Sequence, residues 1–174
     1  MNRHQAIVLA VLAANLVVML MFPPHDSIAL GRGGGETFDA FYFALERHYN
    51  KVVDSNLLLL ELYWVVINAA IAWLLLRDRP QGDTPLMSAR GGVMVLSVVN
   101  LVLIMLFPPL ENYASTLRAG GSYFDGFYFI FGDKWQRHFY IPLLYMEVLW
   151  VLINGALLWL LLRSPAQQPA AEEA

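Results

Sequence analysis

Four long apolar runs constrain the fold of this 174-residue chain more than any other feature. A helix needs about 20 apolar residues to cross the hydrocarbon core of a bilayer, with about 17 as a lower limit. The runs approach or exceed this length, and two of them are short enough to favour upright helices. The sequence therefore predicts four membrane-spanning helices, at Gln5–Phe22, Leu57–Leu76, Gly92–Phe107 and Ile141–Leu162.

Local signals mark the ends of these runs. Pro23-Pro24 and Pro108-Pro109 should end the first and third spans, because proline lacks an amide donor and restrains the preceding residue. Asp54, Ser55 or Asn56 should cap the second span. The first run carries no Ala-x-Ala cleavage pattern, so we expect a retained helix rather than a signal peptide.

Composition narrows the class of protein. The chain is 58% hydrophobic and 14% charged, with a net charge of −3 and no cysteine. No basic stripe indicates nucleic-acid binding, and disulfides, zinc–cysteine sites and iron–sulfur clusters are excluded. The short segments at the inner span ends are denser in arginine than the long loops, which favours cytoplasmic termini. We expect an integral protein of a bacterial-type inner membrane, with membrane lipids and other integral subunits as partners.

The two halves of the chain resemble each other. "ELYWVVINAAIAWLLLR" matches "EVLWVLINGALLWLLLR" at an offset of 86 residues, and "FDAFYF" matches "FDGFYF" at the same offset. We also align Arg47-His48 with Arg137-His138, which requires a four-residue insertion. The expected fold is an all-α membrane protein of two tandem, parallel two-helix repeats, residues 1–86 and 87–163, with a disordered tail at 164–174.

Four asparagines fall inside the predicted spans. At 1.5 Å of rise per residue, each lies about 12–15 Å from the inner boundary, near the midplane. Small residues adjoin three of them, and amides can hydrogen-bond between closely packed membrane helices. The sequence predicts a polar cluster that holds the helices in register, with a polar solute path as the alternative; its members are Asn15, Asn68, Asn100 and Asn154.

Glu61 and Glu147 lie seven residues before Asn68 and Asn154, on the same helix face. A carboxylate inside a span is costly unless it is protonated, hydrated or paired. Three interpretations stay open for these two residues. Each glutamate reaches the outer interface, pairs with a loop arginine such as Arg47 or Arg137, or forms a proton or ion site.

Aromatic residues crowd both long loops. Amphipathic rings favour the headgroup layer, so we expect a short interfacial helix in each loop, with Asp39 and Asp125 near its start as caps or as partners of the helix dipole. The rings anchor the protein in lipid or contact another subunit. This candidate partner or lipid surface comprises Phe41, Tyr42, Phe43, Phe127, Tyr128, Phe129 and Trp135.

Catalytic and cofactor motifs are missing from the sequence. His48 and His138 are the only candidates for a metal or haem site, and no third ligand is repeated beside them. No hydrolase or phosphate-loop pattern is present, so we expect neither an enzyme nor a cofactor. Three functions follow, in order: a non-catalytic accessory, assembly or scaffold subunit of a larger membrane complex; a small proton-coupled transporter or channel using Glu61, Glu147 and the asparagines; and a redox or quinone-binding subunit.

Overall fold

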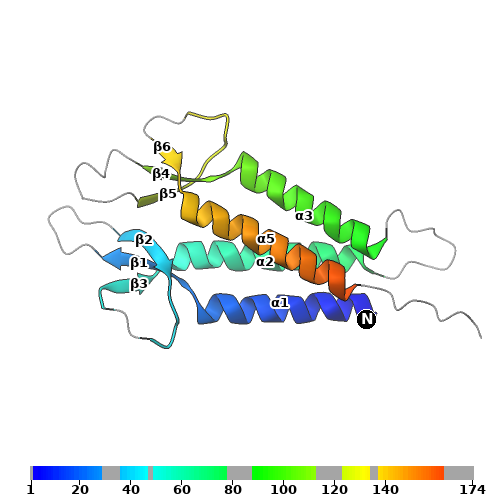
Figure 1. Ribbon diagram of the computed structural model, residues 1–174. Coiled ribbons are helices and arrows are strands. Elements are labelled where there is room, and N and C mark those ends of the chain that lie inside the picture. Colours follow the sequence, from blue (N-terminus) through cyan, green and yellow to red (C-terminus); the bar gives the residue numbers. More distant parts are fainter. Residues whose placement is uncertain are drawn as a thin grey trace, which may run out of the picture.

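The computed structural model describes residues 2–28, 36–46, 49–77, 88–112, 123–133 and 137–162. Within these ranges, four helices are long and apolar enough to cross a membrane. They run alongside one another, and the chain enters the first and leaves the last at the same end of the bundle (Figure 1). The helices are α1 (Arg3–Met21), α2 (Ser55–Leu75), α3 (Ala89–Leu106) and α5 (Ile141–Leu161), close to the predicted spans.

The helix ends follow the local signals. Asp54 caps α2, and its Oδ1 accepts hydrogen bonds from the backbone N–H groups of Asn56 and Leu57, both at 3.0 Å. This confirms one of the three predicted caps. α1 and α3 end two residues before Pro23 and Pro108, as expected from the missing proline donor. Ser88 caps α3 by accepting from the N–H of Gly91 at 3.1 Å.

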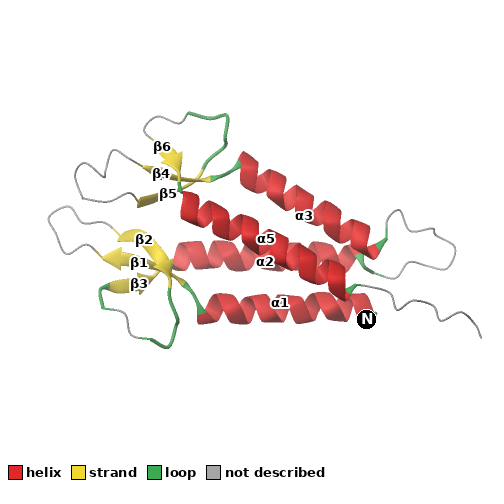
Figure 2. Cartoon of the chain, viewed as in Figure 1, coloured by secondary structure: helices red, strands yellow, loops and turns green. Residues whose placement is uncertain are grey.

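Two small antiparallel sheets lie at one end of the bundle (Figure 2). The first has the order β2-β1-β3 and the second the order β5-β4-β6. The expected all-α fold is therefore wrong in this region, and the described fold is mostly helical with two sheets. The strands are β1 (Pro24–Ile28), β2 (Glu36–Phe41), β3 (Lys51–Val53), β4 (Pro109–Asn112), β5 (Tyr123–Phe127) and β6 (Arg137–Phe139).

The aromatic segments begin as strands rather than as the expected interfacial helices. β2 pairs with β1 and β5 pairs with β4, so the extended chain after each proline pair supplies a hydrogen-bonding partner. Aromatic residues also fit a pleated, half-buried surface well. Asp39 and Asp125 are the extra residues where the register shifts, and not helix caps. A shift of this kind is a β-bulge, which bends the strand and re-aims its side chains.

The strand register also corrects the predicted alignment of the halves. Lys51 lies opposite Ser27 in the first sheet, and Arg137 lies opposite Asn112 in the second. Arg137 therefore occupies the position of Lys51, and His138 that of Val52, so the offset of 86 continues and no insertion is needed. In the sequence, an Arg-His pair is a more conspicuous match than a basic residue that begins a strand, and this similarity favoured the wrong alignment.

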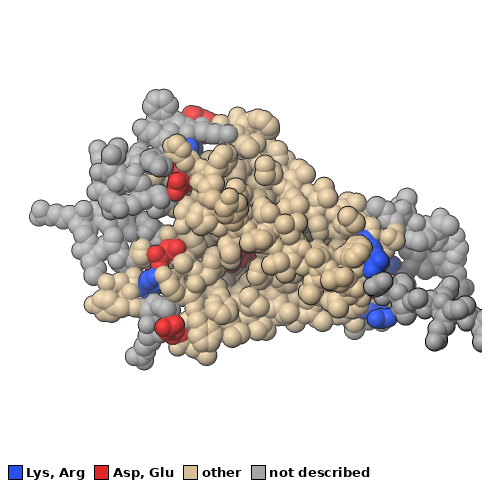
Figure 3. Space-filling model, in the orientation of Figure 1, with Lys and Arg blue, Asp and Glu red and all other residues tan. Residues whose placement is uncertain are grey.

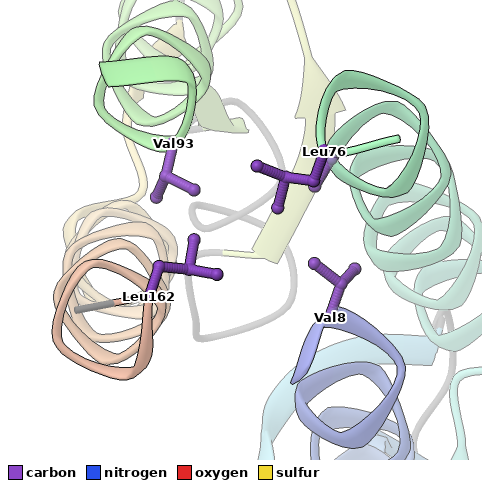
Figure 4. Packing of buried hydrophobic residues seen from close by; sticks show 5 residues of the cluster. Val8, Leu76, Val93 and Leu162 are labelled. Atoms are coloured by element: carbon purple, nitrogen blue, oxygen red, sulfur yellow. The ribbon is translucent and has the colours of Figure 1, made fainter. Parts of the chain in front are cut away.

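The helices form a ring in which α1 packs mainly on α2, and α3 mainly on α5. Fewer contacts, between α2 and α3 and between α1 and α5, join the two halves. At the end opposite the sheets, side chains from all four helix regions close the bundle (Figure 4). This buried cluster consists of Val8, Ala72, Leu76, Val93 and Leu162.

The outer surface of the bundle is apolar. Side chains such as Leu74, Met105 and Ile153 are 59%, 59% and 61% exposed, which suits contact with lipid tails. On the face drawn in Figure 3, charged atoms gather at the two ends and leave a nearly uncharged belt between them. The belt is the expected surface of a membrane-spanning bundle, because charged groups are costly in the hydrocarbon core.

Candidate polar site between the helix pairs

The four asparagines of the predicted spans meet in two pairs, and each pair joins the two halves of the chain. Asn15 and Asn154 bond reciprocally, with Nδ2 to Oδ1 distances of 2.7 Å and 3.0 Å. Asn100 donates from Nδ2 to Oδ1 of Asn68 at 2.6 Å. The pairs link α1 to α5 and α3 to α2, the two boundaries where the helices pack less extensively. The amides therefore supply polar contacts where apolar contacts are fewest.

Each amide also bonds within its own helix. The Nδ2 groups of Asn15 and Asn100 donate to backbone carbonyl oxygens four residues earlier, both at 2.8 Å. Asn68 and Asn154 do the same at 2.9 Å and 3.0 Å. An amide NH₂ has two donors, so one can serve the helix and the other the partner amide. Each back-bond thus holds the amide against its own helix.

A cavity of about 100 Å³ lies between the helices at the level of the asparagines. All four amides line it, together with Ser97 and the indoles of Trp64 and Trp150. A water molecule needs on the order of 10–15 Å³ of such space and two to four polar partners. The cavity is thus large enough for several waters, and most of its lining is apolar.

The glutamates lie nearer the sheets and are half-buried. Among the described residues, Oε2 of Glu147 is buried without a hydrogen-bond partner, and so is Nε1 of Trp150 one turn further along α5. The loop arginine Arg137 bonds to Asp125 instead, and Arg47 lies outside the described residues. A buried carboxylate oxygen without a hydrogen bond is costly if it carries charge. The interpretation of Glu147 as a proton site therefore stays a prediction, and Oε2 is the atom that would take up the proton.

The bulged aspartates each bind a basic residue of the third strand of their sheet, and a tyrosine contacts each of these pairs. Asp39 Oδ2 accepts from Tyr42 at 2.6 Å and forms an ion pair with Lys51. Asp125 Oδ2 accepts from Arg137 Nε at 2.8 Å, and that guanidinium lies 3.9 Å from the centre of the Tyr128 ring. The hydrogen bonds from Lys51 and Tyr42 lower the pKa of Asp39. These two tyrosines thus help to hold the sheets together.

The predicted phenylalanine surface is only partly accessible. The rings of Phe43 and Phe129 lie 5.5 Å from those of Phe22 and Phe107, at the ends of α1 and α3. Phe129 is 47% exposed, whereas the side chains of Phe41, Phe43 and Phe127 are half-buried. Trp135 lies outside the described residues.

The sequence did not single out two highly exposed apolar side chains at the sheet end, Leu45 and Phe131. Leu45 and Phe131 are 86% and 80% exposed, and they are 86 residues apart. Each follows the aromatic block of its half, in a turn whose backbone returns to the helix end: Ala44 N–H donates to Met21 O and Ile130 N–H to Leu106 O, both at 2.8 Å. The sequence signal that could have revealed these two side chains is the repeat offset, because an apolar residue occurs at the same position of both halves.

The histidines come together in no described site. His138 lies exposed on β6, and His48 lies outside the described residues. His25 is buried, with its Nδ1 at 2.8 Å from the carbonyl oxygen of Pro23. In the part of the chain that the structure describes, no group of three or more histidine or acidic side chains could hold a metal ion. No protein-family model, curated protein or solved structure matches the chain, so the geometry alone bears on its function.

Proposed function

We propose that this chain is a non-catalytic accessory, assembly or scaffold subunit of a larger membrane complex. The observation that carries the proposal is the pairing of all four intramembrane amides with one another. Their hydrogen-bonding capacity serves to hold two helix pairs together, which is a structural use of polar groups in lipid. A rigid bundle of this kind can present fixed surfaces to another subunit.

The two halves are tandem repeats in this proposal, with parallel orientation and both termini in the cytoplasm. The shared element order supports the repeats: a helix, three strands and a helix occur in each half. Basic side chains at the end opposite the sheets support the orientation. One of them, Arg90, lies 4.3 Å from the centre of the Trp159 ring.

Cysteines introduced into this cysteine-free chain test the orientation. Leu45→Cys and Phe131→Cys should react with a membrane-impermeant reagent added from outside, and Arg77→Cys only after the membrane is opened. Labelling of Leu45→Cys and Phe131→Cys from opposite sides would exclude parallel repeats.

The turns that carry Leu45 and Phe131 are the partner contacts in this proposal. Both side chains are more than three-quarters exposed, and the backbone of the turn that carries each is held beside a helix end by hydrogen bonds. An apolar anchor held in this way loses little conformational freedom on binding, which favours interface hot spots.

Affinity purification in mild detergent tests this contact. Leu45→Ala combined with Phe131→Ala should reduce the yield of co-purifying membrane proteins at least about fivefold, since anchor residues are worth about 1 kcal/mol or more. Leu74→Ala with Ile153→Ala, which removes exposed side chains from the lipid-facing belt, is the matched control. Undiminished yield in the turn variant would exclude the two turns as the partner contact.

A second candidate function is a small proton-coupled transporter or channel. The cavity at the level of the asparagines and the unpartnered oxygen of Glu147 favour it. Purified protein in liposomes with an internal pH dye distinguishes the two functions. Proton leakage that Glu147→Gln abolishes, with unchanged protein insertion, would place transport above the scaffold; leakage equal to that of empty liposomes would exclude it.

A further inference from the structure

A cleft of about 300 Å³ opens at the sheet end of the bundle, away from the asparagine cavity. It lies where the two sheets meet through β2 and β5, above the first turns of α2. Its polar side chains are Asp26, Asp54 and Asn56, and its aromatic side chains are Phe38, Phe124 and Phe127. Two leucines of α2 complete the described lining.

The lining combines negative charge with aromatic faces. Asp26 and Asp54 carry carboxylates, and no lysine or arginine belongs to the described lining. Nearby, the cation of Lys51 is held by Asp39. Aromatic faces attract cations through their quadrupole, most strongly when the site is partly desolvated. Carboxylates and ring faces in one cleft therefore suit a positively charged group with an apolar body.

The second half of the chain has a tyrosine ring, that of Tyr140, at the position where Asp54 of the first half borders the open cleft. Asp54 and Tyr140 occupy equal positions: each precedes the last helix of its half, and their backbone N–H groups donate to Pro24 O and Pro109 O, both at 2.9 Å. The Tyr140 ring lies 5.9 Å from Phe38 and 6.1 Å from Phe124. Tyrosine thus fills one side of the aromatic cluster, whereas aspartate leaves the other side open and adds a charge.

We propose that the cleft binds a small organic cation, an ammonium group with alkyl substituents, at the position that corresponds to the Tyr140 ring. The phenylalanine rings contact the alkylated ammonium, and the carboxylates of Asp26 and Asp54 neutralise it. Asp54 Oδ1 meanwhile keeps its hydrogen bonds to the start of α2. Such an ammonium is carried both by free amines and by the headgroups of choline lipids.

Equilibrium dialysis of isotope-labelled choline tests the proposal. The full chain is placed in nanodiscs of phosphatidylglycerol, whose headgroup has no ammonium, and empty discs give the background. Choline should bind at least about tenfold more tightly than 3,3-dimethylbutan-1-ol, its uncharged analogue, because the charge carries the recognition. Equal binding of the two compounds, or none of either, would overturn the proposal.

The same assay in phosphatidylcholine discs identifies the source of the ammonium. If the lipid headgroup occupies the cleft, choline binding should fall at least about tenfold relative to phosphatidylglycerol discs, because the lipid competes. Unchanged binding assigns the cleft to a free amine. Either result agrees with an ammonium site.

Variants locate the site. Asp26→Asn with Asp54→Asn should weaken choline binding at least about tenfold, since asparagine keeps the helix cap and removes the charge. Glu111→Gln is the control, because Glu111 holds the position of Asp26 in the other half and does not line the cleft. Equal losses of choline affinity in the double variant and in Glu111→Gln would overturn the assignment of choline binding to this cleft. Should the double variant fail to fold, Phe124→Leu keeps the site testable, because it removes a ring face and retains apolar contact; unchanged binding there would also count against the cleft.

Discussion

The two halves of the bundle share an element order, and yet they differ at the positions that shape their surfaces. Tyr140 of the second half fills one side of the aromatic cluster between the two sheets, whereas Asp54 of the first half borders a charged cleft on the other side. Between α3 and α5, Gly155 lies against Ser97, while the first half has Ala69 and Leu12 at these positions. Similar backbones can therefore carry different chemistry, because single side chains decide which spaces are filled.

The glycine contact gives the largest expected difference between the halves. A Cβ atom at Gly155 would lie 2.5 Å from Ser97 Oγ and 3.3 Å from its Cβ. We expect Gly155→Leu to lower the stability of the bundle in detergent by about 1–3 kcal/mol, the usual cost of overpacking. Ala156→Leu, on the exposed face next to it, should change the melting temperature little. If both variants melt alike, the close approach of α3 and α5 does not limit stability.

The two asparagine pairs differ in a second, smaller way. Asn15 and Asn154 exchange two hydrogen bonds, whereas one bond joins Asn100 to Asn68. Membrane hydrogen bonds average about 0.6 kcal/mol in double-mutant cycles and reach about 1.7. We expect a cycle of leucine substitutions at Asn15 and Asn154 to give the larger coupling energy, measured from melting in detergent. Equal coupling in the Asn68–Asn100 cycle would show that the reciprocal bond adds nothing.

The smallest expected effect is the loss of thermal stability at low pH through Asp39 in the first sheet. The hydrogen bonds from Lys51 and Tyr42 lower the pKa of Asp39 below its ordinary value of 3.8. A carboxylate with a lowered folded-state pKa stabilises the fold above its ordinary pKa, and this stability is lost as pH falls through the folded value. Asp39→Asn should therefore melt slightly earlier than wild type at neutral pH, and the difference should vanish under strong acid.

Thermal unfolding of Asp39→Asn and of the wild type in buffers from neutral pH down to about pH 2 measures this linkage. The effect is small because Asp39 and Lys51 are both partly exposed to solvent, which screens their interaction. A difference between Asp39→Asn and wild type that persists through acid would contradict a role for the ionised carboxylate.

Prediction from the sequence succeeded where one local property decides the outcome. Helix positions follow from apolar length, and Asp54 caps α2 because its short carboxylate reaches free N–H groups. The aromatic blocks were predicted wrongly, because their pairing depends on chain segments at least eight residues away. Aromatic residues favour both a headgroup layer and a pleated sheet, so composition alone does not choose between them.

The sequence by itself determined four apolar helices of membrane-spanning length, their ends, and an amide near the middle of each. Helix length and polar depth are properties of a continuous segment, at 1.5 Å per residue. Tertiary structure alone decided which amides meet, Asn15 with Asn154 and Asn68 with Asn100, because the pairs join residues 139 and 32 positions apart. It also decided that Asp54 borders an open cleft while Tyr140 fills its counterpart, since a space exists only between segments that have already packed.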